Sequence, residues 1–418
     1  MAALQETDNS KKSKGSLLWN LPTEIVIKIM RNSQNFSCLW SLINASSRFE
    51  SIFRAVAWET VEEVMTKTTP VCTQALMRIV VNTRTAPDLF TGVSDVVSYM
   101  SRKKPIGPLL QGLSPQVLHD FVELAHTIHG VAHVCLEFYL EKLMTMKPQR
   151  IDDCDLEDND KIQNMLYSER QSPGRPFQPK ESGPPTYLEE QIVVRVLWRL
   201  QTFLNIKAAS RTGRLAHWSE KEYNQLEMID IPEMPRLFHE STCRWKWQCE
   251  MEQILSVLDF INEVAGDQYG QMENVLAHFL KCPPAVVYDR GFRLPSFSQS
   301  DPMLEKVNGL EKLSDIDNQI ERRPMGWIFY YVMTTNKYRP INHASFKPYR
   351  KFGFALWHTG RMEELGFIAP KSELHGLLGS HEHWFIWRSI LTPEEDAERR
   401  GMAIYWHMQE RKERTIPF

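Results

Sequence analysis

The sequence contains no long apolar run and no excess of either charge. No stretch approaches about 18 uninterrupted apolar residues, and residues 1–16 are polar and mixed in charge, without an apolar signal core. We therefore expect a disordered N-terminal tail, no secretion and no membrane partner. The 49 basic and 52 acidic residues give a formal charge of -3. Such a balance argues against a chain dedicated to binding nucleic acid.

Cysteines and the common catalytic motifs are also scarce. The seven cysteines are scattered, and no two of them have the two-residue spacing that is typical of zinc or redox sites. Reduced thiols in the cytoplasm or nucleus fit this pattern best. The sequence has no Walker loop, no GxGxxG motif after a strand, no GxSxG elbow and no HExxH motif. We expect no cofactor and no catalytic residue.

The composition is that of an ordered chain with helical periodicity. Hydrophobic residues make up 42% and charged residues 24% of the 418 residues, which is enough apolar material for two or three domains at roughly 150 residues each. Apolar residues recur at three- and four-residue steps from Leu188 to Leu204. Ser219 with Glu222, and Thr392 with Glu395, have the spacing of a helix capping box. These patterns predict a mainly all-α fold.

A change in composition divides the chain. Six prolines accompany acidic and polar residues between Lys147 and Thr186, which indicates a linker or a long insertion over 147–186. We expect a helical region at 67–146 before it. A larger helical domain at 187–418 is expected after it, as the part that recognises a target.

The N-terminal residues predict a small group of helices. Pro22 suits the start of a helix, and Leu21, Ile25 and Ile29 share one face of it. A short second helix is expected around Leu39, and a longer third helix is expected from Phe49 onwards. Three small helices enclose little core, so apolar residues should remain exposed for a partner.

Two segments of this region carry a family resemblance. LPTEIVIKIM at 21–30 and LWSLINASSRF at 39–49 resemble the F-box, the trihelical module that docks on the Skp adaptor of cullin ubiquitin ligases. The resemblance covers about 35 residues and includes the Leu-Pro start, the following acidic residue, the paired aliphatics and Ser-Arg-Phe. It places an F-box-like module at 17–66, and the chain as a whole resembles fungal F-box proteins.

The resemblance implies a non-catalytic receptor. Such a chain would bind the Skp-type adaptor and its cullin complex, and it would recruit a protein target for ubiquitination in the cytoplasm or nucleus. The residues expected to form or support the adaptor contact are Leu21, Pro22, Ile25, Ile29, Leu39, Leu42 and Phe49. An alternative is a scaffold or regulatory protein whose F-box-like start does not meet the adaptor.

A second alternative belongs to a different class, a metal-dependent enzyme. A helix predicted from about Pro115 to Lys142 carries four histidines on the side opposite its apolar stripe. Three of them could bind one metal ion together with a nearby carboxylate: His126, His129, His133 and Glu137. No fourth ligand is specified, so we expect a solvated, histidine-rich helix face and no metal.

Overall fold

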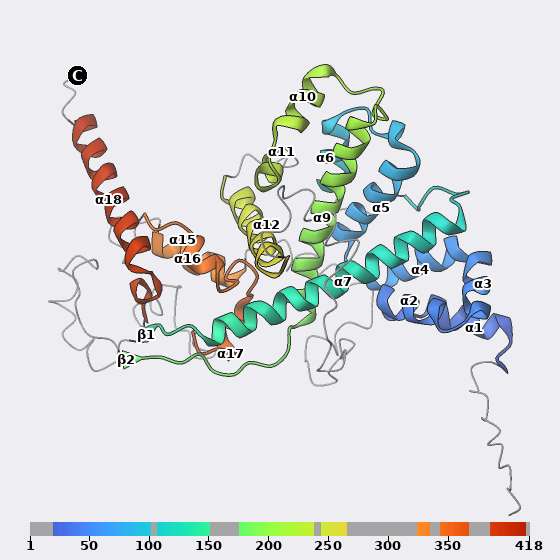
Figure 1. Ribbon diagram of the computed structural model, residues 1–418, viewed down its shortest axis with the longest axis horizontal. Coiled ribbons are helices and arrows are strands. Elements are labelled where there is room, and N and C mark those ends of the chain that lie inside the picture. The colour runs from blue at the N-terminus through green and yellow to red at the C-terminus, as the bar shows by residue number, and fades with distance from the viewer. Residues whose placement is uncertain are drawn as a thin grey trace, which may run out of the picture. The chain divides into compact units, whose positions relative to one another are not determined.

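The computed structural model describes residues 20–101, 107–150, 175–237, 244–265, 324–334, 343–367 and 385–414. This part of the chain is predominantly helical (Figure 1), as predicted. The expected tail at 1–16 lies outside the described residues. None of the described helices is long and apolar enough to cross a membrane.

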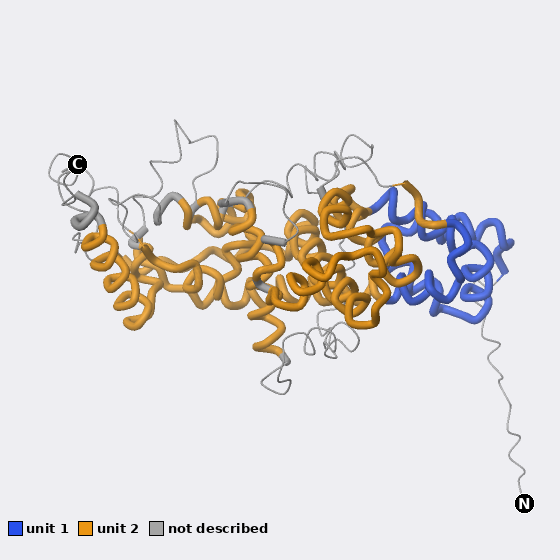
Figure 2. The backbone as a smooth tube through the Cα atoms, turned by 90° about the horizontal axis from the view of Figure 1, so that it is seen from above, with its two compact units in different colours: residues 1–68, 111–123 blue, residues 69–110, 124–418 orange. Residues whose placement is uncertain are grey.

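The chain forms two compact units, coloured separately in Figure 2. The first comprises residues 1–68 and 111–123, and the second comprises residues 69–110 and 124–418. The helix α7 begins in the first unit and continues in the second. Four helices precede it in the first unit: α1 (Thr23–Arg31), α2 (Phe36–Asn44), α3 (Ser47–Ala55) and α4 (Ala57–Thr68).

Local capping sets the helix starts in the first unit. The side chain of Asn35 accepts a hydrogen bond from the backbone N–H of Cys38, and Ser46 accepts one from Phe49. Each bond satisfies one of the N–H groups that a helix start leaves unpaired. Phe36 then packs edge-on against Phe121, with ring centroids 5.6 Å apart, so the first turns of α7 complete the core of this unit.

The predicted third helix is two helices. It ends at Ala55, and α4 starts at Ala57. Val56 between them has a φ of -129° and a ψ of 29°, which lie outside the helical region and so end α3. The break lets α3 bury Phe53 while α4 contacts α1 with another face. Periodicity did not reveal the break, because apolar residues continue at helical spacing on both sides of it.

The second unit contains the other helices that the structure describes. They are α5 (Val71–Thr85), η2 (Pro87–Leu89), α6 (Val93–Ser101), α7 (Pro115–Met144, from residue 124), α9 (Tyr187–Arg211), α10 (Glu220–Met228), η5 (Ile231–Glu233), α11 (Met234–Leu237), α12 (Arg244–Ala265), α15 (Met325–Thr334), α16 (Lys347–Arg350), α17 (Thr359–Glu364), η9 (Trp387–Ile390) and α18 (Pro393–Arg414). The predicted capping boxes at Ser219 and Thr392 begin α10 and α18.

The helix α9 lies in the core of the second unit. It contacts α5, α10 and α12, and a capping box between Thr186 and Glu189 starts it. The sequence predicted one apolar stripe, but polar side chains such as Gln191 and Arg195 are buried as well. A helix that is covered on nearly every side has no solvated face, and its polar groups must find partners inside the protein.

A three-stranded sheet includes residues from both ends of the predicted linker. β1 (Gln149–Arg150) pairs with β2 (Arg175–Pro176) on one side and with β3 (Phe385–Ile386) on the other, all antiparallel. The two ends of the 147–186 segment are therefore part of the fold, and residues 151–174 lie outside the described residues. The segment is an insertion within one unit, because α5 and α9 on either side of it pack together.

Cleavage inside this insertion should leave the second unit assembled. We expect the two fragments to co-elute on a sizing column after an engineered protease site between residues 160 and 161 is cut. The reason is that β1 and α5 come from one fragment while β2, β3 and α9 come from the other. Fragments that separate without denaturant would contradict the shared core. A second variant with the protease site inside α9 serves as the control. The protease should leave this site uncut, which would show that it cleaves only segments that are accessible in the folded protein.

Candidate binding surface

Helix α1 carries apolar side chains on two faces. Val26 and Met30 are 1% and 0% exposed, and they form part of the core of the first unit. Ile25 and Ile29 are 42% and 37% exposed, one helical turn apart on a different face. Large exposed aliphatics one turn apart are unusual on a helix that needs only one buried face. We name the row of Leu21, Ile25 and Ile29 the α1 stripe.

Arg48 holds the start of the α1 stripe in place, although it was not among the residues that the sequence predicted for the contact. The guanidinium of Arg48, at the start of α3, donates a hydrogen bond to the backbone carbonyl of Leu21 at 2.5 Å. A charge-assisted bond of this kind holds the loop before α1 in place. The Ser-Arg-Phe of the sequence motif was the signal for it. Pro22, the next residue, is exposed.

The other predicted contact residues differ in exposure. Leu39 and Phe49 are 0% and 5% exposed, so they support the surface from within and cannot touch a partner in this conformation. Leu42 is half-buried. The candidate surface is therefore carried by α1 and the residues just before it, with α2 and α3 as its support.

The histidines of α7 are not the solvated face that we expected. The side chains of His129 and His133 are 15% and 29% exposed, and each has a carboxylate partner: Glu190 lies 3.4 Å from His129 Nδ1, and Glu137 lies 3.5 Å from His133 Nε2. Burial and the neighbouring His129 lower the pKa of His126. The structure does not bring these three imidazoles and Glu137 within metal-binding distance of one another. α7 buries more residues than those of the predicted apolar stripe, so the side of the helix that carries the histidines is partly covered as well.

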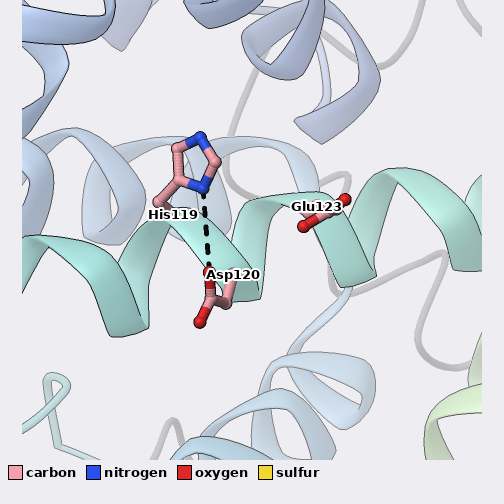
Figure 3. A group of neighbouring side chains, drawn as sticks. All are labelled: His119, Asp120 and Glu123. Atoms are coloured by element: carbon pink, nitrogen blue, oxygen red, sulfur yellow. Dashed lines mark ion pairs between the residues drawn. The ribbon is translucent and has the colours of Figure 1, made fainter. Parts of the chain in front are cut away.

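Among the described residues, one group lies close enough for a metal to be considered. His119, Asp120 and Glu123 lie near the start of α7, and Figure 3 shows them together. The Nδ1 atom of His119 lies 3.8 Å from Asp120 Oδ1 and has no hydrogen-bond partner.

The geometry of this group is looser than that of a zinc shell. Its ligand atoms lie within 4.8 Å of one another, whereas bonds of about 2.0–2.1 Å in a tetrahedron place neighbouring ligand atoms roughly 3.4 Å apart. Asp120 Oδ1 already accepts a hydrogen bond of 2.6 Å from Gln116. The ring of His119 packs against Trp40, with centroids 5.0 Å apart. The group does not fit a preformed metal site.

Chelation should therefore leave the protein unchanged. We expect the melting temperature of the purified chain to be the same with and without a strong chelator, because a structural metal would contribute folding free energy that chelation removes. The measurement is differential scanning fluorimetry. A clear drop, reversed by added zinc and absent in His119→Ala, would show that the group binds metal after all.

A buried ion pair joins two segments of the second unit that are far apart in the sequence. Arg361 and Glu189 are both 0% exposed and form two parallel hydrogen bonds of 3.0 and 2.8 Å. Arg361 also donates to the backbone carbonyls of Gly183 and Pro184, each at 2.7 Å. Burial raises the pKa of Glu189, but the hydrogen bonds and charge of Arg361 outweigh it, and the net pKa is lowered. We name this group the Arg361 clip.

The histidine beside the Arg361 clip does not form a catalytic relay. His358 Nδ1 accepts the backbone N–H of Arg361 at 3.3 Å, so the neutral ring carries its proton on Nε2. That nitrogen lies 2.9 Å from the hydroxyl of Thr186 and 3.9 Å from Glu189. The carboxylate and the hydroxyl therefore lie at the same ring nitrogen, whereas a relay needs them at opposite nitrogens.

The described residues thus offer a binding surface on α1 and a structural clip in the second unit. A receptor or a scaffold would use a surface of the first kind. No family model, no curated protein and no solved structure matches the chain.

Proposed function

We propose that this protein is a substrate-recognition subunit of a Skp-cullin-F-box ubiquitin ligase. In this proposal the first unit binds the Skp-type adaptor through the α1 stripe, and the second unit binds a protein target. The chain itself is not catalytic. It brings the target close to the ligase, and proximity alone contributes much of the rate of a bimolecular reaction.

The observation that carries the proposal is the exposure of Ile25 and Ile29. They lie on a helix that already buries Val26 and Met30, so the fold of the first unit does not require them. Fully burying an aliphatic side chain of this size stabilises a complex by roughly 1.5–3 kcal/mol. A row of such residues behind a Leu-Pro start is what the F-box resemblance implies for an adaptor contact.

The surroundings of the α1 stripe support the same proposal. The hydrogen bond from Arg48 to Leu21 fixes the loop that precedes the stripe. Arg31 lies 3.8 Å from Glu63, and Lys67 donates to Asn32 at 3.1 Å, both between α1 and α4. A surface whose backbone is held at both ends loses little entropy on binding. The described free cysteines, Cys38, Cys72, Cys135 and Cys249, accord with the proposed cytoplasmic or nuclear location.

Affinity purification followed by mass spectrometry tests the proposal. We expect the tagged chain to co-purify with a Skp-type adaptor and a cullin, together with at least one protein that accumulates when the chain is depleted. Recovery of a stable partner without adaptor or cullin would contradict the ligase proposal and favour the scaffold alternative. The full-length chain with Ile25 and Ile29 replaced by alanine is the control, because it should lose the adaptor and keep the target.

A further inference from the structure

The second unit has a cleft between three of its helical segments. Residues of α7, of α12 and of the segment that begins with α16 surround a volume of about 390 Å³. Three lysines, two carboxylates and an amide line it: Lys142, Lys347, Lys351, Asp259, Glu263 and Asn262. Ammonium groups therefore outnumber carboxylates along its wall, which favours an anionic ligand. We name this site the lysine cleft.

Both carboxylates of the lysine cleft already have cationic partners. Glu263 on α12 forms an ion pair with Lys142 on α7. Asp259 Oδ2 lies 3.4 Å from Nη1 of Arg350, a guanidinium that also pairs at 2.7 Å with Glu252, which is buried and does not line the cleft. These pairs weaken the repulsion that Glu263 and Asp259 would otherwise exert on an anion.

The two lysines on the α16 side are less well neutralised. Lys347 is exposed and forms no ion pair with any other residue that the structure describes. Lys351 Nζ lies 3.5 Å from Glu395 Oε2, and that oxygen already accepts the backbone N–H of Thr392 at 2.8 Å. Like charges four positions apart on a helical turn repel each other. A bound anion would relieve this repulsion.

The openness of the lysine cleft favours a peptide over a small molecule. The side chains of Lys142, Asp259 and Glu263 are 31%, 49% and 55% exposed. A small ligand usually buries about 70–90% of its surface, which walls as open as these do not provide. An acidic peptide can instead place successive carboxylates against amines on both walls. Nucleic acid fits less well, because its continuous row of phosphates would also meet Asp259 and Glu263.

We propose that the lysine cleft binds an acidic peptide segment whose neighbouring carboxylates pair with Lys347 and Lys351. The inference rests on the proposed function in one respect, since the segment would belong to the protein target that the second unit recruits. Binding of the peptide itself does not require the adaptor, which contacts the first unit. The two proposals can therefore fail separately.

Binding of a fluorescent peptide of about ten glutamates to the full chain tests the proposal. We expect saturable binding at micromolar concentrations that weakens as salt is added, because exposed charges are screened. A glutamine peptide of the same length should not bind. Lys347→Glu with Lys351→Glu should weaken binding of the glutamate peptide by at least about tenfold, because attraction becomes repulsion. Fluorescence anisotropy measures each affinity.

Lys180→Glu with Lys221→Glu is the matched control. Both lysines are exposed in the second unit and lie outside the lysine cleft, and their replacement changes the net charge by the same amount. This variant should bind the glutamate peptide like the wild type. Circular dichroism of every variant confirms folding.

Glu263→Gln tests the opposite wall of the cleft. It releases Lys142 from its ion pair and should strengthen peptide binding about threefold. Glu227→Gln is the control, because it breaks an exposed pair with Arg211 at 3.2 Å between residues that do not line the cleft. It should leave the affinity unchanged.

Several results would overturn the proposal. They are equal binding of the glutamine peptide, wild-type affinity in the Lys347 and Lys351 variant, an equal loss in the Lys180 and Lys221 variant, and tighter binding of a single-stranded oligonucleotide than of the peptide. Adaptor binding is measured on the same proteins. A chain that binds the peptide in this way but no adaptor would keep the lysine cleft and reject the ligase proposal, and the reverse result would reject the cleft alone.

Discussion

Replacing Arg361 with methionine should lower the free energy of unfolding by about 3–5 kcal/mol, because it leaves the carboxylate of Glu189 buried without its partner. The carbonyls of Gly183 and Pro184 lose their donors in the same change. Domains of ordinary stability unfold at about 5–15 kcal/mol, so much of the stability of the second unit should disappear. Urea unfolding followed by circular dichroism measures the loss.

The double variant Arg361→Met with Glu189→Met is the matched control. It removes both charges, and replacing a whole buried pair by apolar residues is often neutral or stabilising. We therefore expect it to recover most of the stability that the single variant loses. A single variant within about 1 kcal/mol of the wild type would show that the Arg361 clip contributes little.

The same pair predicts a pH dependence. The pKa of Glu189 is lowered in the folded state, so its contribution to stability is fully present above the unfolded pKa of about 4.3 and is lost as the pH falls through the folded value. Wild-type stability should fall below about pH 4 more steeply than that of the double variant, which lacks this carboxyl group. Parallel curves for the two proteins would contradict the assignment.

Replacing Ile25 and Ile29 with alanine should weaken adaptor binding by roughly thirtyfold or more, since loss of a central apolar anchor typically costs about 2 kcal/mol. Both side chains are exposed, so the fold of the first unit should tolerate the change. The measurement is the dissociation constant of the purified chain for the Skp-type adaptor. Leu21→Ala with Pro22→Ala should reduce binding in the same direction.

Met228→Ala is the control for this experiment. Met228 is 86% exposed on α10 in the second unit. Its replacement by alanine therefore removes a similar amount of apolar surface at a position that is distant in the sequence from the α1 stripe. It should bind the adaptor like the wild type. If the Ile25 and Ile29 variant binds the adaptor as tightly as the wild type does, the adaptor contact does not use the α1 stripe.

Local signals in the sequence predicted local structure well. The capping boxes at Ser219 and Thr392 placed the starts of α10 and α18, and apolar periodicity predicted α7 to within two residues of its end. Such signals depend on residues three or four positions apart, which a sequence displays directly.

Features that depend on distant residues could not be predicted. Arg361 and Glu189 are separated by 172 positions, and neither carries a local sign of its partner. The burial of α9 on nearly all sides and the pairing of β1 with β3 are likewise products of the whole fold. Periodicity reports one face of a helix, and it does not report how many neighbours cover the others.

The candidate site was predicted in part. Ile25 and Ile29 lie one turn apart on α1, as their spacing indicated, whereas Leu21 precedes the helix. The sequence could not tell that Ile25 and Ile29 are exposed while Val26 and Met30 are buried. Two of the expected contact residues, Leu39 and Phe49, prove to be core. The distinction matters because only exposed residues can be tested without loss of the fold.

Direct binding of the purified full chain to a purified Skp-type adaptor is the most decisive measurement. The proposal predicts a one-to-one complex with a dissociation constant of about 1 µM or lower, corresponding to about -8 kcal/mol, and a clear loss of affinity in the Ile25 and Ile29 variant. A folded wild-type chain that shows no binding at micromolar concentrations would contradict the ligase-receptor account.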